Sequence, residues 1–297
     1  RVIGECQLSE ILKMRDISKR FPGVLALDNV SLSIERGEVH ALLGENGAGK
    51  STLMKILSGA YKKDAGEIIF DGQPVQINSP RQAQELGVSI IYQELNLVPQ
   101  LSVAENIFLS SLPMKNPACI DWKRVYSDAQ TIIDSLEVDI NVRSRISSLG
   151  IAQQQMVEIA KALSTNAKII ILDEPTAALT RNESEKLYTL VDKLKENGVS
   201  IIFISHRFED MYRLASRVTV FRDSQYIGTY DVDGITNADL IKAMVGREIN
   251  DLFPKPEVKF GDEMLRIEHL SRIGFFKDVS FNVHAGEIVG LTGLVGA

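Results

Sequence analysis

The sequence of 297 residues lacks the features of a disulfide-rich, a membrane-spanning or a strongly basic nucleic-acid-binding protein. Its two cysteines, Cys6 and Cys119, are too few for a disulfide framework, so we expect free thiols in a reducing compartment. The longest apolar runs, around Ile169–Leu172 and Ile201–Ile204, are far shorter than the ~20 residues that a helix needs to span a bilayer, and they suit buried strands. Acidic residues outnumber basic ones, 39 to 33, so no global field attracts nucleic acid.

What remains is an ordinary globular composition, in which short β-rich runs alternate with amphipathic helical stretches. This alternation is typical of an α/β fold with a mainly parallel sheet. A strand over Val39–Gly44 is followed by a glycine-rich turn and a helix to about Ser58, and Asp71-Gly72 joins the two strands of a predicted hairpin. The other predicted strands are Glu67–Phe70, Pro74–Ile77, Val88–Tyr92, Ile169–Leu172, Ile201–Ile204 and Val218–Phe221.

Helical patterns dominate over residues 104–163, where the β signals fade, and they predict an inserted helical subdomain. A further helix is predicted after the strand that ends near residue 172, with Thr180 and Glu183 as its capping box and Gly198 as its C-terminal stop. A short helix over Asn237–Met244 closes the domain.

The end of the sequence repeats part of its beginning. An offset of 249 residues, which places Gly37 on Gly286, brings identical residues together on the glycine turn and on the strand before it. The further identities pair Val30 with Val279, Ser31 with Ser280, Leu42 with Leu291, Gly44 with Gly293, Gly47 with Gly296 and Ala48 with Ala297. This clustering indicates duplication. We therefore expect one domain over 11–248, a proline-containing linker over 249–263, and over 264–297 the start of a second domain that stops before its phosphate-binding residues.

The segment Gly44–Thr52 matches the P-loop pattern G-x-x-x-x-G-K-[ST]. Glycines are needed there because Cβ atoms would keep backbone N–H groups from converging on phosphate oxygens, and the following helix points its positive end at the same anion. In this pattern Lys50 places a charge between the β- and γ-phosphates, and the Ser51 hydroxyl binds Mg²⁺. The predicted nucleotide-binding residues are Gly44, Glu45, Asn46, Gly47, Ala48, Gly49, Lys50, Ser51 and Thr52.

Two carboxylates, Asp173 and Glu174, follow four apolar residues of a predicted buried strand. Parallel α/β sheets place ligands at the carboxyl ends of their strands. Taken alone, an apolar run that ends in Asp-Glu is more often a strand entering a turn. Beside a P-loop it predicts that Asp173 holds Mg²⁺ through water and that Glu174 orients and polarises the attacking water.

Three isolated residues are candidates to complete such a site. Gln93 and His206 each follow a predicted buried strand, so their side chains can reach the same edge of the sheet. A single Gln or His in such a place is more often structural, and Phe21, before the first core strand, is by default a packing residue. Their assignment depends on the order of the motifs along the chain.

In order and spacing these motifs resemble the ATP-binding cassette (ABC) family over residues 11–248. The resemblance implies that Phe21 stacks on adenine, that Gln93 senses the permease and Mg²⁺, and that His206 contacts the γ-phosphate. It also implies an α/β P-loop NTPase fold with a RecA-like parallel-sheet core, an antiparallel β-subdomain and the inserted helical subdomain. ATP and Mg²⁺ are the implied cofactors, and Lys50 and Glu174 are among the implied catalytic residues.

Further features resemble the import ATPases for ribose, xylose, galactose and arabinose, in which two ATPase halves share one polypeptide. They are the segments Tyr92–Leu109 and Met244–Glu248, the short linker and the restart GEIVGLTGLVGA. The resemblance implies an ATPase that couples MgATP hydrolysis to monosaccharide uptake at the cytoplasmic face of the inner membrane. Its implied partners are membrane permease subunits, the second cassette and, indirectly, a sugar-binding protein, with no nucleic acid among them. The residues do not indicate which sugar is carried.

Two elements depart from the family's pattern. The D-loop ends in Thr180, where the family usually has Asp, and the signature LSGGQ has lost its serine hydroxyl and its glycines after the second position. The residues aligned with the signature are Leu149, Gly150, Ile151, Ala152 and Gln153. A signature offers a helix N-terminus to the γ-phosphate bound by the opposite half, so we expect a weakened grip here. The resemblance thus implies two unequal ATP sites.

Two other classes of protein compete with a transport ATPase. A soluble tandem ABC protein acting in translation or on RNA typically carries a long charged linker and intact signatures, neither of which is present, and the acidic charge does not favour RNA. A non-catalytic nucleotide binder is disfavoured because Glu174 and His206 are both in place. An ATPase assay with and without the permease separates the three.

Overall fold

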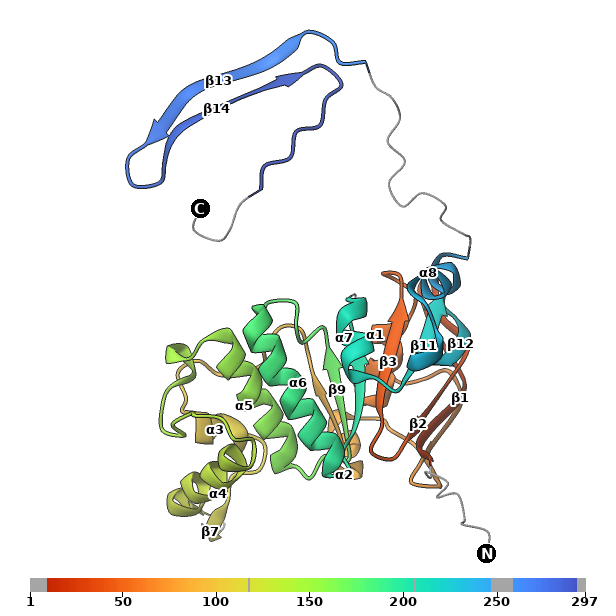
Figure 1. Ribbon diagram of the computed structural model, residues 1–297. Coiled ribbons are helices and arrows are strands. Elements are labelled where there is room, and N and C mark those ends of the chain that lie inside the picture. Colours follow the sequence, from red (N-terminus) through yellow and green to blue (C-terminus); the bar gives the residue numbers. More distant parts are fainter. Residues whose placement is uncertain (1–9, 117, 206, 247–258, 293–297) are drawn as a thin grey trace, which may run out of the picture. The chain divides into compact units, whose positions relative to one another are not determined.

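The computed structural model describes residues 10–116, 118–205, 207–246 and 259–292 (Figure 1). Cys6, His206, most of the predicted linker and the last residues of the second copy lie outside these ranges. The chain divides into two compact units, Arg1–Glu248 and Ile249–Ala297. Within the described ranges, no helix has both the length and the apolar character needed to cross a bilayer.

A six-stranded sheet in the order β12-β11-β3-β10-β9-β6 forms the centre of the first unit (Figure 1). Neighbouring strands from β11 to β6 run parallel, and only β12 pairs antiparallel among these described strands. The register aligns Ile204 with both Asp173 and Leu42, so the carboxyl ends of β3, β9 and β10 meet at one edge. The strands are β3 (Val39–Gly44), β6 (Val88–Ile91), β9 (Ile169–Asp173), β10 (Ser200–Ile204), β11 (Arg217–Arg222) and β12 (Gln225–Asp231).

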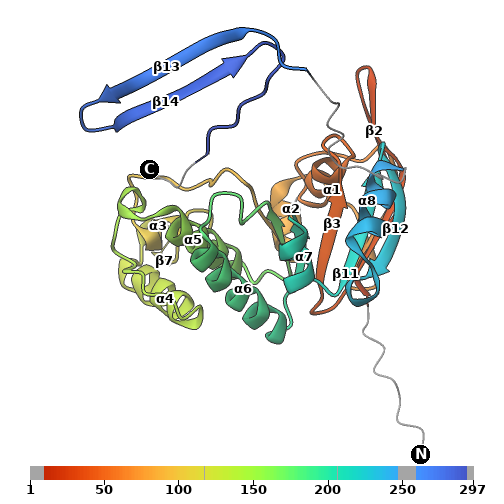
Figure 2. The same cartoon turned by 45° about the horizontal axis from the view of Figure 1, so that its top comes forward.

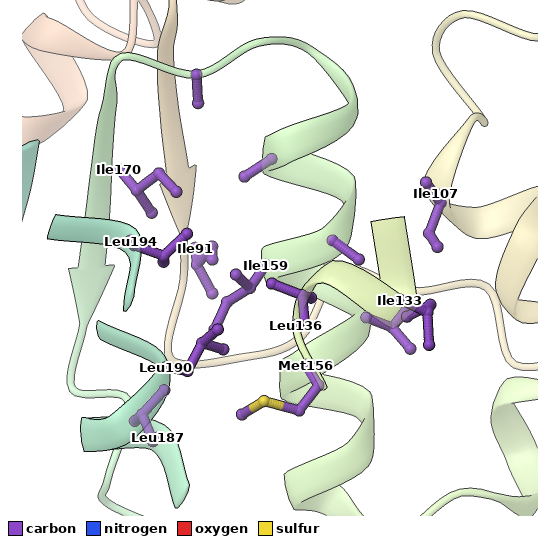
Figure 3. Close-up of a cluster of buried hydrophobic side chains, with 14 of the residues drawn as sticks. Ile91, Ile107, Ile133, Leu136, Met156, Ile159, Ile170, Leu187, Leu190 and Leu194 are labelled. Carbon is purple, nitrogen blue, oxygen red and sulfur yellow. The ribbon is translucent and has the colours of Figure 1, made fainter. Parts of the chain in front are cut away.

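The central strands are apolar along their length because both faces of the sheet are covered. Along β9, Ile170 and Leu172 pack against helices on one face, whereas Ile169 and Ile171 pack on the opposite face. Figure 3 shows the helical side, where side chains of β6 and β9 meet those of α5 and α6. The helices of this side are α3 (Val103–Ile107), α4 (Trp122–Ser135), α5 (Ile151–Ser164) and α6 (Arg181–Glu196).

The other face is covered by α1 (Lys50–Leu57) and by an antiparallel sheet in the order β2-β1-β4-β5. Its strands are β1 (Glu10–Phe21), β2 (Val24–Glu35), β4 (Ala65–Phe70) and β5 (Gln73–Val75). The remaining helices of this unit in the described chain are α2 (Pro80–Leu86), α7 (Phe208–Leu214) and α8 (Asn237–Val245), with single 3₁₀ turns at Ile146–Ser148 and Val232–Gly234. Helix α7 lies beside α6 in both views (Figures 1 and 2).

The expected fold class is confirmed. The predicted strand before the P-loop is β3, the predicted hairpin is β4–β5, and Thr180 and Glu183 form the capping box of α6. Gly198, with φ of 80°, follows the end of that helix as expected. The structure adds α2 and α7, each of seven residues, which are too short to show a helical period. It also adds a small hairpin, β7 (Met114–Asn116) with β8 (Cys119–Ile120), inside the helical region.

The second unit contains a two-stranded hairpin, β13 (Glu263–Arg272) and β14 (Phe276–His284). Its backbone repeats details of the β1–β2 hairpin. The residues with left-handed φ are Asp16 and Asn29 in the first copy and His269 and Asp278 in the second. In each copy a serine hydroxyl on the second strand accepts a hydrogen bond from the first of these residues, Ser31 from Asp16 and Ser280 from His269. These shared details support the duplication inferred from the sequence.

Candidate active site

The segment between β3 and α1 is a tight loop. β3 is buried along its whole length and ends at Gly44, so the loop begins at the carboxyl end of the central strand. Gly47 and Gly49 have φ values of 85° and 102°, in the left-handed region that glycine favours. A Cβ atom on Gly49 would lie 2.6 Å from Cδ2 of Leu27 and 2.7 Å from the carbonyl oxygen of Ala26. The backbone is therefore packed closely against β2, which leaves no room for a side chain at this point.

Lys50 begins α1 and its side chain turns back into the loop. Its Nζ donates hydrogen bonds to the carbonyl oxygens of Gly44 at 2.7 Å and of Glu45 at 3.0 Å. Burial lowers the pKa of Lys50, and the negative charges of Glu174 and Asp173 partly oppose that shift. The ammonium group is therefore enclosed by the loop and within electrostatic range of both carboxylates.

A cavity of about 130 Å³ joins the loop to the carboxyl end of β9. The residues that line it are Asn46, Gly47, Ala48, Gly49, Lys50, Ser51, Thr52, Asp173, Glu174 and Ile204. Ile204 was predicted as the end of a strand but not as a site residue, although the end of a strand beside β9 lies at the same edge of the sheet. The two motifs that sequence reasoning placed in one site thus border the same space.

The chemistry of the cavity suits a phosphate group with a divalent cation. Its volume is far below the ~300 Å³ at which pockets for whole drug-sized ligands begin, so it accommodates only a small group. The loop and the start of α1 present backbone N–H groups and the Lys50 charge to an anion. The Ser51 hydroxyl and the carboxylates of Asp173 and Glu174 are hard oxygen donors of the kind that Mg²⁺ prefers. The residues present therefore fit both groups.

Three other predicted site residues lie elsewhere or outside the described chain. Gln93 follows β6 and is exposed, and Phe21 ends β1, where its ring meets the Tyr61 ring edge-on at a centroid distance of 5.3 Å. Among the described residues, the lining of the 130 Å³ cavity includes neither of them. His206 lies outside the described residues. The roles of these three residues stay predictions.

The residues aligned with the family signature start α5. Gly150 is the N-cap, and its N–H donates to the Gln153 side chain at 3.2 Å. Ile151 is 54% exposed, so its side chain points into solvent at the first turn of the helix. Ala152 and Gln153 line a separate cavity of about 690 Å³ beside α4 and α6. The bulky group predicted to weaken the signature is thus presented at the surface of this unit.

Comparison with known families agrees with this geometry. The family model for ABC transporters matches residues 27–177, which include the loop, the acidic strand end and the helical region between them. The chain belongs to the ABC transporter family. Among solved structures, this ABC chain is similar to the ADP conformation of MJ1267, an ATP-binding cassette of an ABC transporter, with a TM-score of 0.71 and 26% identity over 80% of this chain and all of that one.

Curated relatives of this ABC chain are named as import ATP-binding proteins. The galactose/methyl galactoside import ATP-binding protein MglA of Salmonella typhimurium is 48% identical over 97% of the chain and 57% of the relative. The ribose import ATP-binding protein RbsA 1 of Rubrobacter xylanophilus is 50% identical over 97% of the chain and 57% of the relative. The chain therefore spans little more than half the length of the curated relatives that it matches.

Proposed function

We propose that this chain binds MgATP at the loop 44–52 and hydrolyses it as the ATP-binding component of a carbohydrate importer. The observation that carries the proposal is the cavity in which the P-loop, Lys50 and the two carboxylates at the end of β9, Asp173 and Glu174, meet. Phosphoryl transfer needs such an arrangement, because the developing charge must be stabilised while the attacking water is oriented. Family membership and the similarity to an ATP-binding cassette in its ADP conformation support the same nucleotide chemistry.

The nucleotide is held by the loop and by one aromatic ring in this proposal. Backbone N–H groups of the loop and the Lys50 ammonium bind the β- and γ-phosphates. Phe21 stacks on adenine, a role that its partial exposure at the end of β1 permits. The small volume of the cavity supports a division of this kind, with the phosphates inside and the base outside.

Hydrolysis depends on the acidic strand end in this proposal. Ser51, Asp173 and Gln93 hold Mg²⁺, which neutralises charge on the phosphates when it is bound. Glu174 orients and polarises the attacking water, and His206 contacts the γ-phosphate. Glu174 lines the cavity next to the loop, which supports a place for its carboxylate beside the terminal phosphate.

The transported cargo is a monosaccharide in this proposal, because several relatives are named for the import of ribose, galactose and methyl galactoside. Permease subunits change conformation together with the cassettes, and a sugar-binding protein delivers the sugar to these subunits. The chain lies at the cytoplasmic face of the membrane. A second cassette completes the protein. The repeated hairpin β13–β14 and the greater length of the relatives support this last element.

ATP binding is tested by titrating the complete protein with a fluorescent ATP analogue and Mg²⁺. Lys50→Ala removes the cation inside the loop, so we expect the Kd to rise by about tenfold to a hundredfold, as for the loss of a charged hydrogen bond. Lys62→Ala, at an exposed position away from the cavity, is the control and should leave the Kd unchanged. An unchanged Kd for Lys50→Ala would remove the basis of the proposal.

Transport is tested with the complete protein and its permease in proteoliposomes. We expect uptake of one sugar among ribose, xylose, galactose and arabinose, dependent on ATP on the cassette side, and faster ATP turnover with the permease than without it. ATPase activity that ignores the permease but rises with ribosomes or RNA would instead favour a soluble tandem ABC protein.

A further inference from the structure

Asp210 is a fully buried carboxylate on α7. It belongs to none of the family motifs found in the sequence. Three hydroxyl groups donate to it: Thr176 Oγ1 to Oδ2 at 2.5 Å, Ser205 Oγ to Oδ2 at 3.0 Å, and the hydroxyl of Tyr188 to Oδ1. The Arg207 Nε lies 3.9 Å from Oδ1, on a side chain that is half exposed. Burying a carboxylate costs folding free energy unless its oxygens are hydrogen-bonded. Breaking any of these three hydrogen bonds is therefore unfavourable, and the carboxylate fixes the positions of the three hydroxyls.

The three hydroxyls come from three different elements. Thr176 lies two residues after Glu174 in the loop that follows β9, and Ser205 directly follows β10. Tyr188 is on α6, beside α7 (Figure 2). Thr176 and Ser205 are themselves buried. Asp210 therefore connects the ends of the two strands that border the cavity and attaches both to the helical layer.

At the end of β9 the backbone needs such support. Glu174 has φ of 48°, a left-handed conformation that is uncommon for a residue with a side chain. Its N–H donates to the carbonyl oxygen of Ile204 at 2.9 Å, which couples the ends of β9 and β10. Conformations of this kind persist only where the surroundings hold them, and the bond from Thr176 to Asp210 restrains the loop just beyond.

At the end of β10 the same carboxylate acts through Ser205. The Ser205 hydroxyl donates to Asp210 and accepts a hydrogen bond from the Arg207 N–H at 3.0 Å. Ser205 is thus bonded to Asp210 directly, and the backbone of Arg207 is bonded to it through Ser205. Burial and, after it, the bond to Asp210 raise the pKa of Tyr188 to about 12, so this hydroxyl stays a donor at any physiological pH.

We infer that Asp210 is a positioning residue for ATP hydrolysis, which holds the loop that carries Glu174 and anchors Ser205 at the end of β10. The inference rests on the proposed ATPase function and adds to it a residue that does not touch the nucleotide. The hydroxyls of the two strand-end loops bond Oδ2, whereas the hydroxyl from α6 bonds Oδ1, so the two sets of hydroxyl contacts can be removed separately.

The first test measures ATP turnover and ATP binding of Asp210→Asn in the complete protein. Asn keeps the shape but replaces one acceptor oxygen by an NH₂ donor, which faces a hydroxyl that is itself donating. We expect kcat to fall about tenfold or more, because small displacements of catalytic groups are costly. The KM and Kd for MgATP should stay within about twofold, since the P-loop is untouched.

A matched pair of variants separates positioning from general stabilisation. Thr176→Val and Tyr188→Phe each remove one hydroxyl from the same carboxylate with little change of shape, so similar losses of Tm are expected. Thr176→Val releases a strand-end loop and should lower kcat about tenfold at unchanged KM. Tyr188→Phe releases only the contact with α6 and should keep kcat within about twofold of the parent.

The outcomes divide cleanly. If Thr176→Val keeps the parent's kcat, or if Tyr188→Phe and Thr176→Val lower kcat equally, Asp210 only stabilises the fold and the inference is wrong. This holds even if Asp210→Asn does not fold. A parent protein with no ATPase activity would overturn the proposed function and this inference with it, whereas an active parent with unaffected variants overturns this inference alone.

Discussion

Glu174 is the residue on which the chemistry of the site depends most. It lines the cavity of the P-loop, and its backbone is held in a left-handed conformation that directs the chain out of β9. Asp173 precedes it in the regular strand, where it pairs with Ile204 of β10. Two adjacent carboxylates thus have different backbone settings, which suits them to the different tasks proposed for them.

Glu174→Gln should abolish hydrolysis and retain binding of MgATP. The amide keeps the size of the side chain but cannot polarise water, so we expect kcat to fall at least about a hundredfold, within the range for loss of a general base. The measurement is phosphate release at saturating MgATP, together with a binding titration. Glu185→Gln, at an exposed position on α6, is the control. Hydrolysis by Glu174→Gln at the parent's rate would show that another group acts on the water.

At the scale of elements, the loop between β3 and α1 offers a comparison between two glycines. Gly47 and Gly49 both have left-handed φ, but only Gly49 has backbone and side-chain atoms of β2 within 3 Å of an added Cβ. An added Cβ on Gly47 meets no described atom within 4 Å. Backbone strain is common to both positions, whereas steric overlap is specific to one.

Gly49→Ala should therefore be more harmful than Gly47→Ala. Both carry a left-handed penalty of roughly 1–2 kcal/mol, and we expect Gly49→Ala to lose about 1–3 kcal/mol more through the overlap with Ala26 and Leu27. Urea unfolding curves of the two variants measure this difference. Nucleotide affinity should also fall more for Gly49→Ala, because the loop must shift away from β2. Equal losses in the two variants would mean that the loop moves freely.

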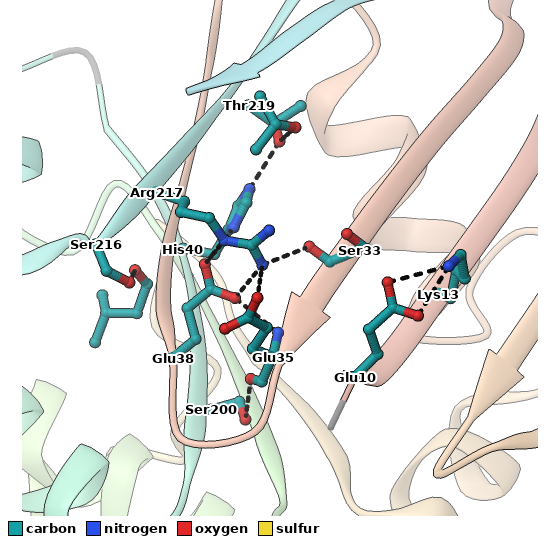
Figure 4. Close-up of polar contacts among 12 residues, drawn as sticks. Glu10, Lys13, Ser33, Glu35, Glu38, His40, Ser200, Ser216, Arg217 and Thr219 are labelled. Atoms are coloured by element: carbon teal, nitrogen blue, oxygen red, sulfur yellow. Dashed lines mark hydrogen bonds and ion pairs between the residues drawn. The ribbon is translucent and has the colours of Figure 1, made fainter. Parts of the chain in front are cut away.

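A second element-scale feature is the buried charge network at the start of β3 (Figure 4). Glu38 accepts hydrogen bonds from Nε and Nη2 of Arg217 on β11, at 2.8 and 2.7 Å, and lies 2.8 Å from Nδ1 of His40. Burial raises the pKa of Glu38, but the hydrogen bonds from His40 and Arg217 outweigh it and lower the pKa to about 2. This network attaches β11 to β3, the strand that leads into the P-loop.

Stability should depend on the charge of Glu38 in acid. The folded pKa of about 2 lies below the ordinary value of 4.5, so the stabilisation is complete above about pH 4.5 and is lost as the pH falls toward 2. Glu38→Gln should cost about 3 kcal/mol near neutral pH, because Arg217 loses its buried partner, and should flatten the acid dependence. Chemical denaturation across that pH range measures both effects.

The control for this prediction is Glu67→Gln, whose ion pair with Arg15 is half exposed on both sides. Exposed pairs contribute little, so this variant should change the unfolding free energy by less than about 1 kcal/mol. If Glu38→Gln kept the acid dependence of the parent, the loss of stability in acid would come from other carboxylates.

At the scale of the whole molecule, the two copies of the hairpin differ in how deeply their paired apolar side chains are buried. In the first copy the paired residues Ile17 and Val30 are fully buried, whereas in the second copy the corresponding pair, Leu270 and Val279, is 48% and 37% exposed. The first copy is covered by α1 and by the core sheet, both of which follow it in the chain. A continuation of the same kind would cover the second, which supports the proposal of a second cassette.

A protein ending at residue 248 should fold and bind MgATP as the complete protein does. The buried clusters of the first unit draw, among the described residues, on that unit alone. Turnover should be at least about tenfold slower, because no opposite signature reaches the γ-phosphate and a lost transition-state contact costs that much or more. Calorimetry and a turnover assay compare the two proteins. Turnover at the rate of the complete protein would show that one cassette suffices.

Much of the fold and of the candidate site could be predicted because the evidence is local. The P-loop is one contiguous segment between a strand and a helix, and the capping box of α6 lies within four residues. The short helices α2 and α7 were missed because seven residues show no clear period. Asp210 was missed because an acidic residue in the first turn of a helix ordinarily just favours the helix dipole.

The sequence by itself determined the phosphate-binding loop and the acidic strand end, since each is a run of consecutive residues whose chemistry has few other uses. The order of these motifs along the chain determined the family. Only the tertiary structure decided that Asp173 and Glu174 share a cavity with Lys50, and that one buried carboxylate gathers hydroxyls from two strand ends and a helix. The physical reason is that such contacts depend on strand order and on parallel register, which spacing along the chain does not specify.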